Sequence, residues 1–334
     1  MIYVHIPFCR SFCTYCDFYS ERICRGEDGR TFSEFVSELV SEAGARREEI
    51  VRTLALNTLY IGGGTPSVLP LSLLRKIVEA LPYGPFEEFT IEVNPDDIVE
   101  KGKEYVRGLL DLGVNRISMG VQSLDDGILR WMNRRHDGDG ARRAFGILRD
   151  AGVENVSVDI ITGLSQLTDE TLSQTLSEIV SWRPEHISAY QLSIEEGSAL
   201  ARMTEDGRYV EASEEHCRSQ YDRLCAALAA ASYEHYEISN WALPGFRSRH
   251  NSAYWRRLPY VGLGPGAHSL RGADRRSWNS SCLSGWTSSG ETLNAEQIRE
   301  ETLMLGLRTK EGVCGKLIPE KDWFVADSII ADML

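Results

Sequence analysis

The chain has 334 residues, of which 42% are hydrophobic and 25% are charged, the balance of an ordinary globular protein. Its formal net charge is −13, which argues against nucleic acid as a partner, because nucleic-acid-binding proteins usually present a basic face. No apolar run approaches the roughly 18 residues of a membrane span, and the N-terminus lacks the basic region and cleavage site of a signal peptide. We therefore expect a cytoplasmic protein without a transmembrane segment, whose thiols are reduced.

Strand and helix patterns alternate along the first two thirds of the chain. Apolar runs predict strands at 2–6, 56–61, 89–93, 116–121, 156–161 and 186–194. Apolar residues at helical spacing predict a helix after each strand, at 32–43, 74–81, 105–110, 141–148, 172–180 and 221–228. A capping box at Thr31-Phe-Ser-Glu34 predicts where the first helix begins. Six strand–helix units in series predict an α/β fold with a parallel sheet and outer helices, and the mostly apolar strands predict that both faces are covered.

The alternation ends near Tyr236. Residues 240–290 are rich in Gly, Ser, Asn, Arg and Trp and show no clear periodicity, whereas residues 295–307 have a helical pattern. Six units are fewer than the eight of a closed TIM barrel, so we expect an open, partial (β/α)6 barrel of the TIM type over residues 1–235. A small, mainly helical C-terminal region is expected over residues 236–334.

Three cysteines directly after the first strand have the spacing C-x3-C-x2-C: Cys9, Cys13 and Cys16. Cysteine thiolates are soft ligands that suit iron–sulfur clusters or zinc. A [4Fe–4S] cluster normally takes four cysteines, so three would leave one iron open to a small molecule. A structural zinc site and three unrelated thiols remain alternatives, although zinc sites more often add a second cysteine pair or two histidines.

Polar and glycine residues cluster where the predicted strands end, which is the edge that carries active sites in barrel-like α/β folds. Gly62-Gly-Gly-Thr-Pro66 could let the backbone approach a ligand closely, or could simply form a tight turn. Glu92 and Gln122 end the third and fourth strands. Asp159 lies among apolar residues in the fifth strand, so it needs a partner or a cavity, and Arg134 is expected to pair with it either directly or through a ligand.

The cysteine spacing resembles that of the radical S-adenosylmethionine (SAM) superfamily, in which the amino and carboxylate groups of SAM chelate the open iron. Within it, six segments of the chain resemble the oxygen-independent coproporphyrinogen oxidase family and its heme-chaperone branch. They are Tyr3-Val-His-Ile-Pro-Phe-Cys9, Gly62-Gly-Gly-Thr-Pro66, Glu92-Val-Asn-Pro95, Ser118-Met-Gly-Val-Gln122, Tyr236-Glu-Ile-Ser-Asn240 and His250-Asn-Ser-Ala-Tyr-Trp255. They occur in the family's order and cover nearly the whole chain.

The resemblance implies the fold and cofactors of a radical-SAM partial barrel. It implies a [4Fe–4S] cluster on Cys9, Cys13 and Cys16, and one or two SAM molecules. The implied SAM contacts are Tyr3, Tyr15, Gly63, Gly64, Thr65, Glu92, Gln122, Arg134 and Asp159.

The segment from His250 to Trp255 is the expected heme site. From the residues alone, a histidine beside aromatic residues is more often a core histidine than a metal ligand. The resemblance associates this segment with heme, which makes His250 the first candidate for an iron ligand, with Tyr254 and Trp255 contacting the porphyrin. His268, in Gly264-Pro-Gly-Ala-His268, is the second candidate ligand.

Two features favour the chaperone branch over the oxidase. The oxidase carries a fourth cysteine two residues after the third, where this chain has Phe18, and it has an extension before the first strand, which here begins at Ile2. The resemblance therefore implies a protein that carries heme to an acceptor protein. A radical-SAM decarboxylase of coproporphyrinogen III, or a radical-SAM enzyme with another substrate, is the alternative, so enzymatic activity is left open. Thr162-Gly-Leu-Ser165 departs from the usual family pattern, and the end at Leu334 predicts a reduced C-terminal region.

Overall fold

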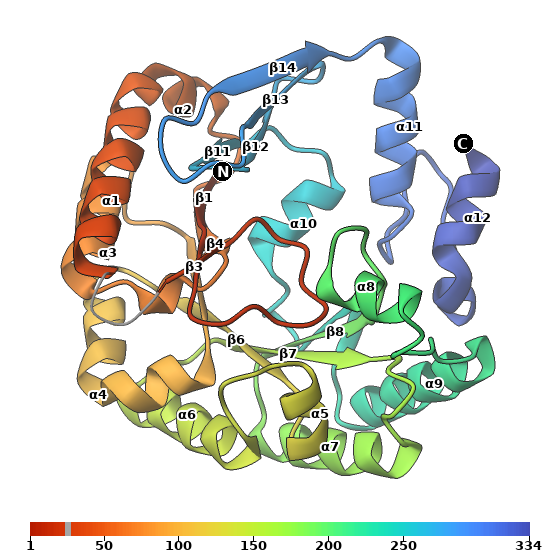
Figure 1. Ribbon diagram of the computed structural model, residues 1–334. Helices are drawn as coiled ribbons and strands as arrows, with labels where there is room; N and C mark the ends of the chain where they lie inside the picture. Colours follow the sequence, from red (N-terminus) through yellow and green to blue (C-terminus); the bar gives the residue numbers. More distant parts are fainter. Residues whose placement is uncertain (24–27) are drawn as a thin grey trace.

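The computed structural model describes residues 1–23 and 28–334, with only the backbone of 28–30, and its centre is a nine-stranded sheet. The strands lie in the order β11-β1-β4-β5-β6-β7-β8-β10-β9 (Figure 1). They are β1 (Ile2–Ile6), β4 (Thr58–Gly63), β5 (Glu88–Val93), β6 (Arg116–Gln122), β7 (Val156–Thr162), β8 (His186–Gln191), β9 (Glu234–Glu237), β10 (Asn240–Ala242) and β11 (Val261–Leu263). Neighbouring strands are parallel from β1 through β4, β5, β6 and β7 to β8, which confirms the six predicted barrel strands.

Helices cover the outer face of these strands and form an arc around them in Figure 1. They are α1 (Asp28–Ala45), α2 (Arg47–Thr53), α3 (Leu71–Ala80), α4 (Pro95–Asp111), α6 (Gly138–Ala151), α7 (Asp169–Trp182) and α9 (Glu214–Ala230). The short helices α5 (Asp126–Trp131) and α8 (Ala199–Glu205) lie instead beside the cysteine loop. The predicted start of the first helix is wrong, because α1 begins at Asp28 and Thr31 lies within it. None of the described helices has the length and apolar character needed to cross a membrane.

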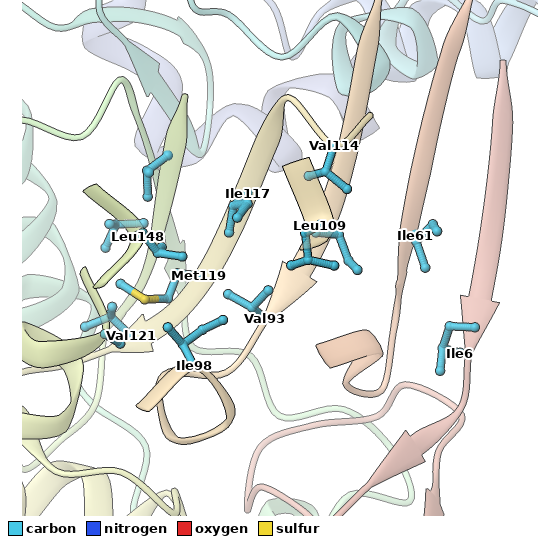
Figure 2. Close-up of a cluster of buried hydrophobic side chains, with 14 of the residues drawn as sticks. Ile6, Ile61, Val93, Ile98, Leu109, Val114, Ile117, Met119, Val121 and Leu148 are labelled. Atoms are coloured by element: carbon cyan, nitrogen blue, oxygen red, sulfur yellow. The ribbon is translucent and has the colours of Figure 1, made fainter. Parts of the chain in front are cut away.

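The parallel strands alternate between apolar and polar residues, whereas the sequence predicted mostly apolar strands. Strand β6 shows the pattern, since its outward side chains pack against α4 and α6 in Figure 2. These outward residues are Ile117, Met119 and Val121. The intervening residues of β6, Arg116, Ser118 and Gln122, line a cavity on the inner face. The helix-covered face therefore provides the apolar core, and the inner face is available for polar chemistry.

The stretch 240–290, in which the sequence predicted no elements, contains short strands and one helix. β11 extends the main sheet beside β1, and β10 and β9 extend it antiparallel beyond β8. A separate antiparallel sheet contains β12 (His268–Arg271), β13 (Arg275–Asn279) and β14 (Ser288–Thr292). The remaining elements are β2 (Phe8–Cys9), β3 (Glu21–Arg22), the 3-10 helices Pro66–Val68 and Glu320–Val325, α10 (Arg249–Trp255), α11 (Ala295–Gly306) and α12 (Ala326–Met333).

A second, smaller core lies near the C-terminus. It consists of Leu303, Leu307, Ile318, Trp323, Ala326 and Ile330. Residues after 235 thus supply both edges of the main sheet as well as this core, and the division of the chain at 235 and 236 stays a prediction.

Candidate functional site

A cavity of about 590 Å³ lies at the carboxyl ends of the parallel strands. This volume falls within the range of small-molecule sites in proteins. The cysteine loop lines one side of it, and side chains from β4, β5, β6, β7 and β8 line the rest. The cavity contains most of the predicted site residues: Cys9, Cys13, Tyr15, Cys16, Gly63, Gly64, Thr65, Glu92, Gln122, Arg134 and Asp159.

The cysteine loop is fixed by hydrogen bonds to its surroundings. The backbone N–H of Thr14 donates to Met132 O at 3.1 Å, and its hydroxyl donates to Trp131 O at 2.8 Å. Leu200 N–H donates to Thr14 O at 2.9 Å, and Asn133 Nδ2 donates to Phe12 O at 2.7 Å. The ends of α5 and α8 therefore hold the loop in place over the cavity.

The environment of the three thiols fits a metal cluster. Burial raises the pKa of Cys9, and it raises the pKa of Cys16 to about 12, so each thiolate needs a nearby positive charge such as iron. Arg134 Nη1 donates to Cys13 Sγ at 3.4 Å. Among the described residues no three His, Cys, Asp or Glu side chains converge on one metal-ion position. A cubane cluster places its thiolate ligands on separate irons, so its ligands need not converge in that way.

The other cysteines that the structure describes lie outside this cavity. Cys24 lies outside the described residues, and the remaining ones are not among the residues that line the cavity. They are Cys217, Cys225, Cys282 and Cys314.

The glycine turn after β4 allows the cysteine loop to lie directly against it. Gly64 N–H donates to Ile6 O at 2.8 Å. A Cβ atom on Gly64 would lie 2.8 Å from Phe8 O and 3.0 Å from Cys9 Sγ, which is too close for either atom. Gly63 has a φ of 113°, in the region that favours glycine, and its N–H donates to Glu92 Oε2 at 3.1 Å. The turn therefore positions both the cluster loop and a cavity carboxylate.

Two of the carboxyl groups that line the cavity are on barrel strands. Glu92 accepts a hydrogen bond from the Tyr60 hydroxyl at 2.7 Å, and burial raises its pKa to about 7. Asp159 accepts from Ser118 Oγ at 3.2 and 3.0 Å, and burial raises its pKa as well. Both groups can therefore exchange a proton more readily near neutral pH than ordinary carboxyls.

The predicted direct pair between Arg134 and Asp159 is wrong. Arg134 Nη2 donates instead to Asn94 Oδ1 at 2.8 Å and to Gly120 O at 2.6 Å, whereas Asp159 is held by serine hydroxyls. Among the described residues, Arg134 Nε and Gln122 Oε1 are buried without a hydrogen-bond partner. These two polar atoms are left for a ligand or for water.

Sequence reasoning missed Arg116, which is 1% exposed and lines the cavity. Its Nε and Nη1 have no hydrogen-bond partner in the described part of the chain. The positive charge of Arg116 lowers the pKa of both Glu92 and Asp159, against the larger effect of burial. The alternation of side chains along a strand could have indicated it. Arg116 is two residues before Ser118 and an even number of residues before Gln122, so all three side chains point to the same face of β6.

Tyr3 is the predicted SAM contact that does not line the cavity. His5 Nε2 donates to Tyr19 O at 2.9 Å, so His5 Nδ1 accepts from the Tyr3 hydroxyl at 3.0 Å. The Tyr3 ring lies 6.1 Å from the Tyr60 ring, centroid to centroid. Tyr3 therefore supports residues of the cavity from behind.

The predicted heme segment lies on α10, at the amino ends of β4 and β5. His250 is fully buried, and its ring bonds Thr58 Oγ1 at 2.8 Å and the Tyr254 hydroxyl at 3.0 Å. Burial also lowers its pKa to about 3. Glu88 accepts hydrogen bonds from the His250 and Arg249 N–H groups at 2.9 and 2.8 Å.

The two other predicted heme contacts, Tyr254 and Trp255, are partly buried. The Arg308 guanidinium lies over the Trp255 ring, with its Cζ atom 5.4 Å from the centroid of that ring. Asn251, but none of His250, Tyr254 and Trp255, lines the cavity. Heme ligation by His250 stays a prediction, and it would require both ring hydrogen bonds to break. The second candidate, His268, is exposed at the start of β12.

Comparison with known proteins places the chain in a family. Residues 3–179 match the model of the Radical SAM superfamily. The heme chaperone HemW of Synechocystis sp. is 33% identical over 99% of this chain and 83% of that protein. The chain belongs to the HemW family of the radical SAM superfamily. The HemW protein of Bacillus subtilis is 31% identical, over 99% of this chain and 89% of that protein.

A solved structure shares the fold of this HemW-family chain. It is the coproporphyrinogen III oxidase HemN from Escherichia coli, described as a radical SAM enzyme. The TM-score is 0.76 and the identity 20%, over 92% of this chain and 75% of that one. At this identity the likeness shows the common fold alone, and it agrees with the parallel sheet and outer helices described above.

Proposed function

We propose that this protein is a heme chaperone, which binds heme and transfers it to an acceptor protein, and that it also carries a [4Fe–4S] cluster and SAM. The observation that carries the proposal is the identity of about a third to heme chaperones of the HemW family along nearly the whole chain. The cytoplasmic location expected from the sequence is part of the same proposal.

The cavity residues support the cofactor part of the proposal. Cys9, Cys13 and Cys16 would hold the cluster, and a cluster with three protein ligands supplies an iron that can accept SAM. Glu92 and Asp159 present carboxylate oxygens to the same cavity, and these suit the ammonium and hydroxyl groups of SAM. Tyr15, Gly63, Gly64, Thr65, Gln122 and Arg134 line the same space. Tyr3 does not line this cavity, and its contact with SAM stays a prediction.

The competing function is oxidative decarboxylation of coproporphyrinogen III by a radical-SAM enzyme. Phe18 argues against it, because it stands where the resemblance places a fourth cysteine of the oxidase. Its side chain is 67% exposed and lines the cavity. A phenyl ring has no donor atom for a metal, so this position cannot supply the missing thiolate.

Anaerobic reconstitution followed by two assays on one sample tests the proposal. We expect about four irons per chain, an intense Soret band when hemin is added, and no conversion of coproporphyrinogen III. Cys13→Ala should lose the cluster, and Cys225→Ala, on α9 away from the cavity, is the matched control that should keep it. Absence of heme binding by the intact protein, or turnover of coproporphyrinogen III, would contradict the chaperone function.

A further inference from the structure

A heme carrier needs a ligand for the iron, and the chain offers seven histidines. Five are buried, and their rings form hydrogen bonds: His5, His136, His186, His235 and His250. His216 is partly exposed, but its Nε2 lies 3.0 Å from Leu167 O. His268 is exposed, and its ring has no hydrogen bond to another described residue. Among the described histidines, it is therefore the one whose ring an iron atom could reach without breaking a hydrogen bond of that ring.

The neighbour of His268 suits a porphyrin. His268 on β12 lies directly opposite Trp278 on β13 in the antiparallel pairing, so both side chains point to the same face of the hairpin. The two rings are stacked, with centroids 6.3 Å apart and an interplanar angle of 29°. The lone pair of an imidazole nitrogen lies in the plane of the ring, so a porphyrin whose iron is bound there stands roughly perpendicular to the His268 ring. It would meet the edge of the nearly parallel indole beside it, and edge-to-face contacts between aromatic rings are favourable.

The charge next to His268 favours the ligating form of its ring. Partial burial and the charge of Arg276 hold the pKa of His268 below its usual value. Arg276 is itself fixed, because its Nε donates to Glu291 Oε1 at 2.9 Å and its Nη1 to Glu301 Oε1 at 2.5 Å. At neutral pH the imidazole is therefore mostly uncharged, and the neutral ring is the form that binds iron.

We propose that His268 is the axial ligand of the heme and that Trp278 contacts the porphyrin beside it. The inference rests on the heme-carrying function proposed above. A ring nitrogen of His268 donates its lone pair to the iron, and a water ligand of free hemin leaves, with no net change in electrons or protons. Because His268 is on the surface, the side of the iron opposite the imidazole stays open to a ligand from the acceptor protein. That ligand can then replace the imidazole.

Titration of the full-length, cluster-loaded protein with hemin tests the assignment. We expect His268→Ala to weaken hemin binding at least about tenfold and to shift the Soret band, and free imidazole in the buffer should restore the parent spectrum. Trp278→Ala should weaken binding a few-fold, and Trp278→Phe less, because the phenyl ring keeps an aromatic surface. His216→Ala is the matched control and should bind hemin like the parent. The iron content of the cluster should be the same in all variants.

Each other outcome is decisive. If the parent binds hemin and His268→Ala binds it with the same affinity and spectrum, the ligand assignment is overturned and the chaperone function stands. Weakened binding that imidazole does not restore would also overturn it, because the histidine would then act in some way other than as a ligand. If the parent itself binds no hemin, both this inference and the proposed function fail.

Discussion

The carboxyl group of Glu92 makes the stability of the cluster-free protein depend on pH. Burial raises its pKa from 4.5 to about 7. Between these values the folded chain binds the proton and the unfolded chain releases it, so the free energy of unfolding falls as the pH rises through this window. The Tyr60 hydroxyl, Asp159 and Arg116 are the charged or titratable groups that act on it.

Glu92→Gln should remove this dependence. We expect the variant to gain up to about 3 kcal/mol relative to the parent between about pH 5 and about pH 8, because one pKa unit corresponds to about 1.4 kcal/mol. Denaturant unfolding of both proteins across this range measures the difference. Glu195→Gln, which changes an exposed carboxylate that also lines the cavity, is the control. A constant difference between Glu92→Gln and the parent at every pH would contradict the assigned pKa.

Arg116 should influence SAM binding through the charge state of the two cavity carboxyl groups. Removing its charge raises the pKa of Glu92 and Asp159 further, so fewer carboxylate acceptors are present at neutral pH. We expect Arg116→Met to bind SAM about tenfold more weakly near pH 7, with recovery as the pH rises, whereas Arg116→Lys keeps most of the affinity. Calorimetric titration of the reconstituted proteins with SAM measures this. The same deficit at every pH would assign Arg116 a purely structural role.

At the residue level, most of the residues that line the cavity could be identified from their positions at the ends of the predicted strands. Gly63, Glu92 and Gln122 were predictable because each follows or ends an apolar run. Arg116 was not predicted as a site residue, because its strand was interpreted as a mostly apolar run. Such a run leaves no polar face on which a cation could line a cavity. Likewise, the partner of Asp159 depends on the register of β6 against β7, which brings Ser118 within reach and which the sequence does not state.

At the level of elements, the turn after β4 should control the cluster although it contributes no ligand. Gly64→Ala would place a Cβ atom against Phe8 O and Cys9 Sγ. We expect this variant to fold but to retain less than about half of the four irons per chain after reconstitution. Iron analysis and the visible spectrum provide the measurement.

Gly146→Ala is the matched glycine control for that experiment. A Cβ atom on Gly146 would meet no atom within 4 Å, and the residue lies inside α6. Alanine is the better helix former by up to about 1 kcal/mol, so this variant should be slightly more stable and carry the full cluster. Equal iron contents in the two variants would contradict the steric role of Gly64.

The barrel strands and the long helices between them were predictable, because apolar runs and apolar residues at helical spacing extend over enough residues to be recognised. The short helices α2, α5, α8 and α10 were not predicted. Nor were the short strands after residue 236. β11 has three residues, Val261–Leu263, and is a strand because β1 lies beside it. The hairpin β12–β13 places His268, Arg271 and Arg275 among polar residues and carries little alternation. In such segments the pairing partner decides the conformation, and single-sequence propensity does not contain that information.

At the level of the whole molecule, the second core is joined to the main sheet through aromatic rings. His235 on β9 stacks on Trp241 of β10, with centroids 4.0 Å apart, and meets the Trp323 ring edge-on at 4.4 Å. Trp323 is buried, and its Nε1 donates to Ile318 O at 2.9 Å. The C-terminal helices are therefore packed against a strand pair that continues the barrel sheet.

Trp323→Ala should lower the free energy of unfolding by about 3–5 kcal/mol, since it leaves a large cavity in a small core. We expect a single unfolding transition that shifts as a whole, because β9 and β10 link the second core to β8. Thermal unfolding followed by circular dichroism and by tryptophan fluorescence measures it. Two separate transitions would instead show that the region after residue 235 folds on its own.

The position of α10 has a consequence for the order in which the cavity is filled. Thr58, Glu88, His250 and Arg116 are all buried, so the amino ends of the barrel strands are closed and ligands reach the cavity from the cysteine-loop side. Iron and SAM would then share one route, and SAM held beside Cys9, Cys13 and Cys16 would lie on that route. Cluster assembly must therefore precede SAM binding, and bound SAM should slow the extraction of iron by a chelator. Equal extraction rates with and without SAM would mean that a second route leads to the cluster.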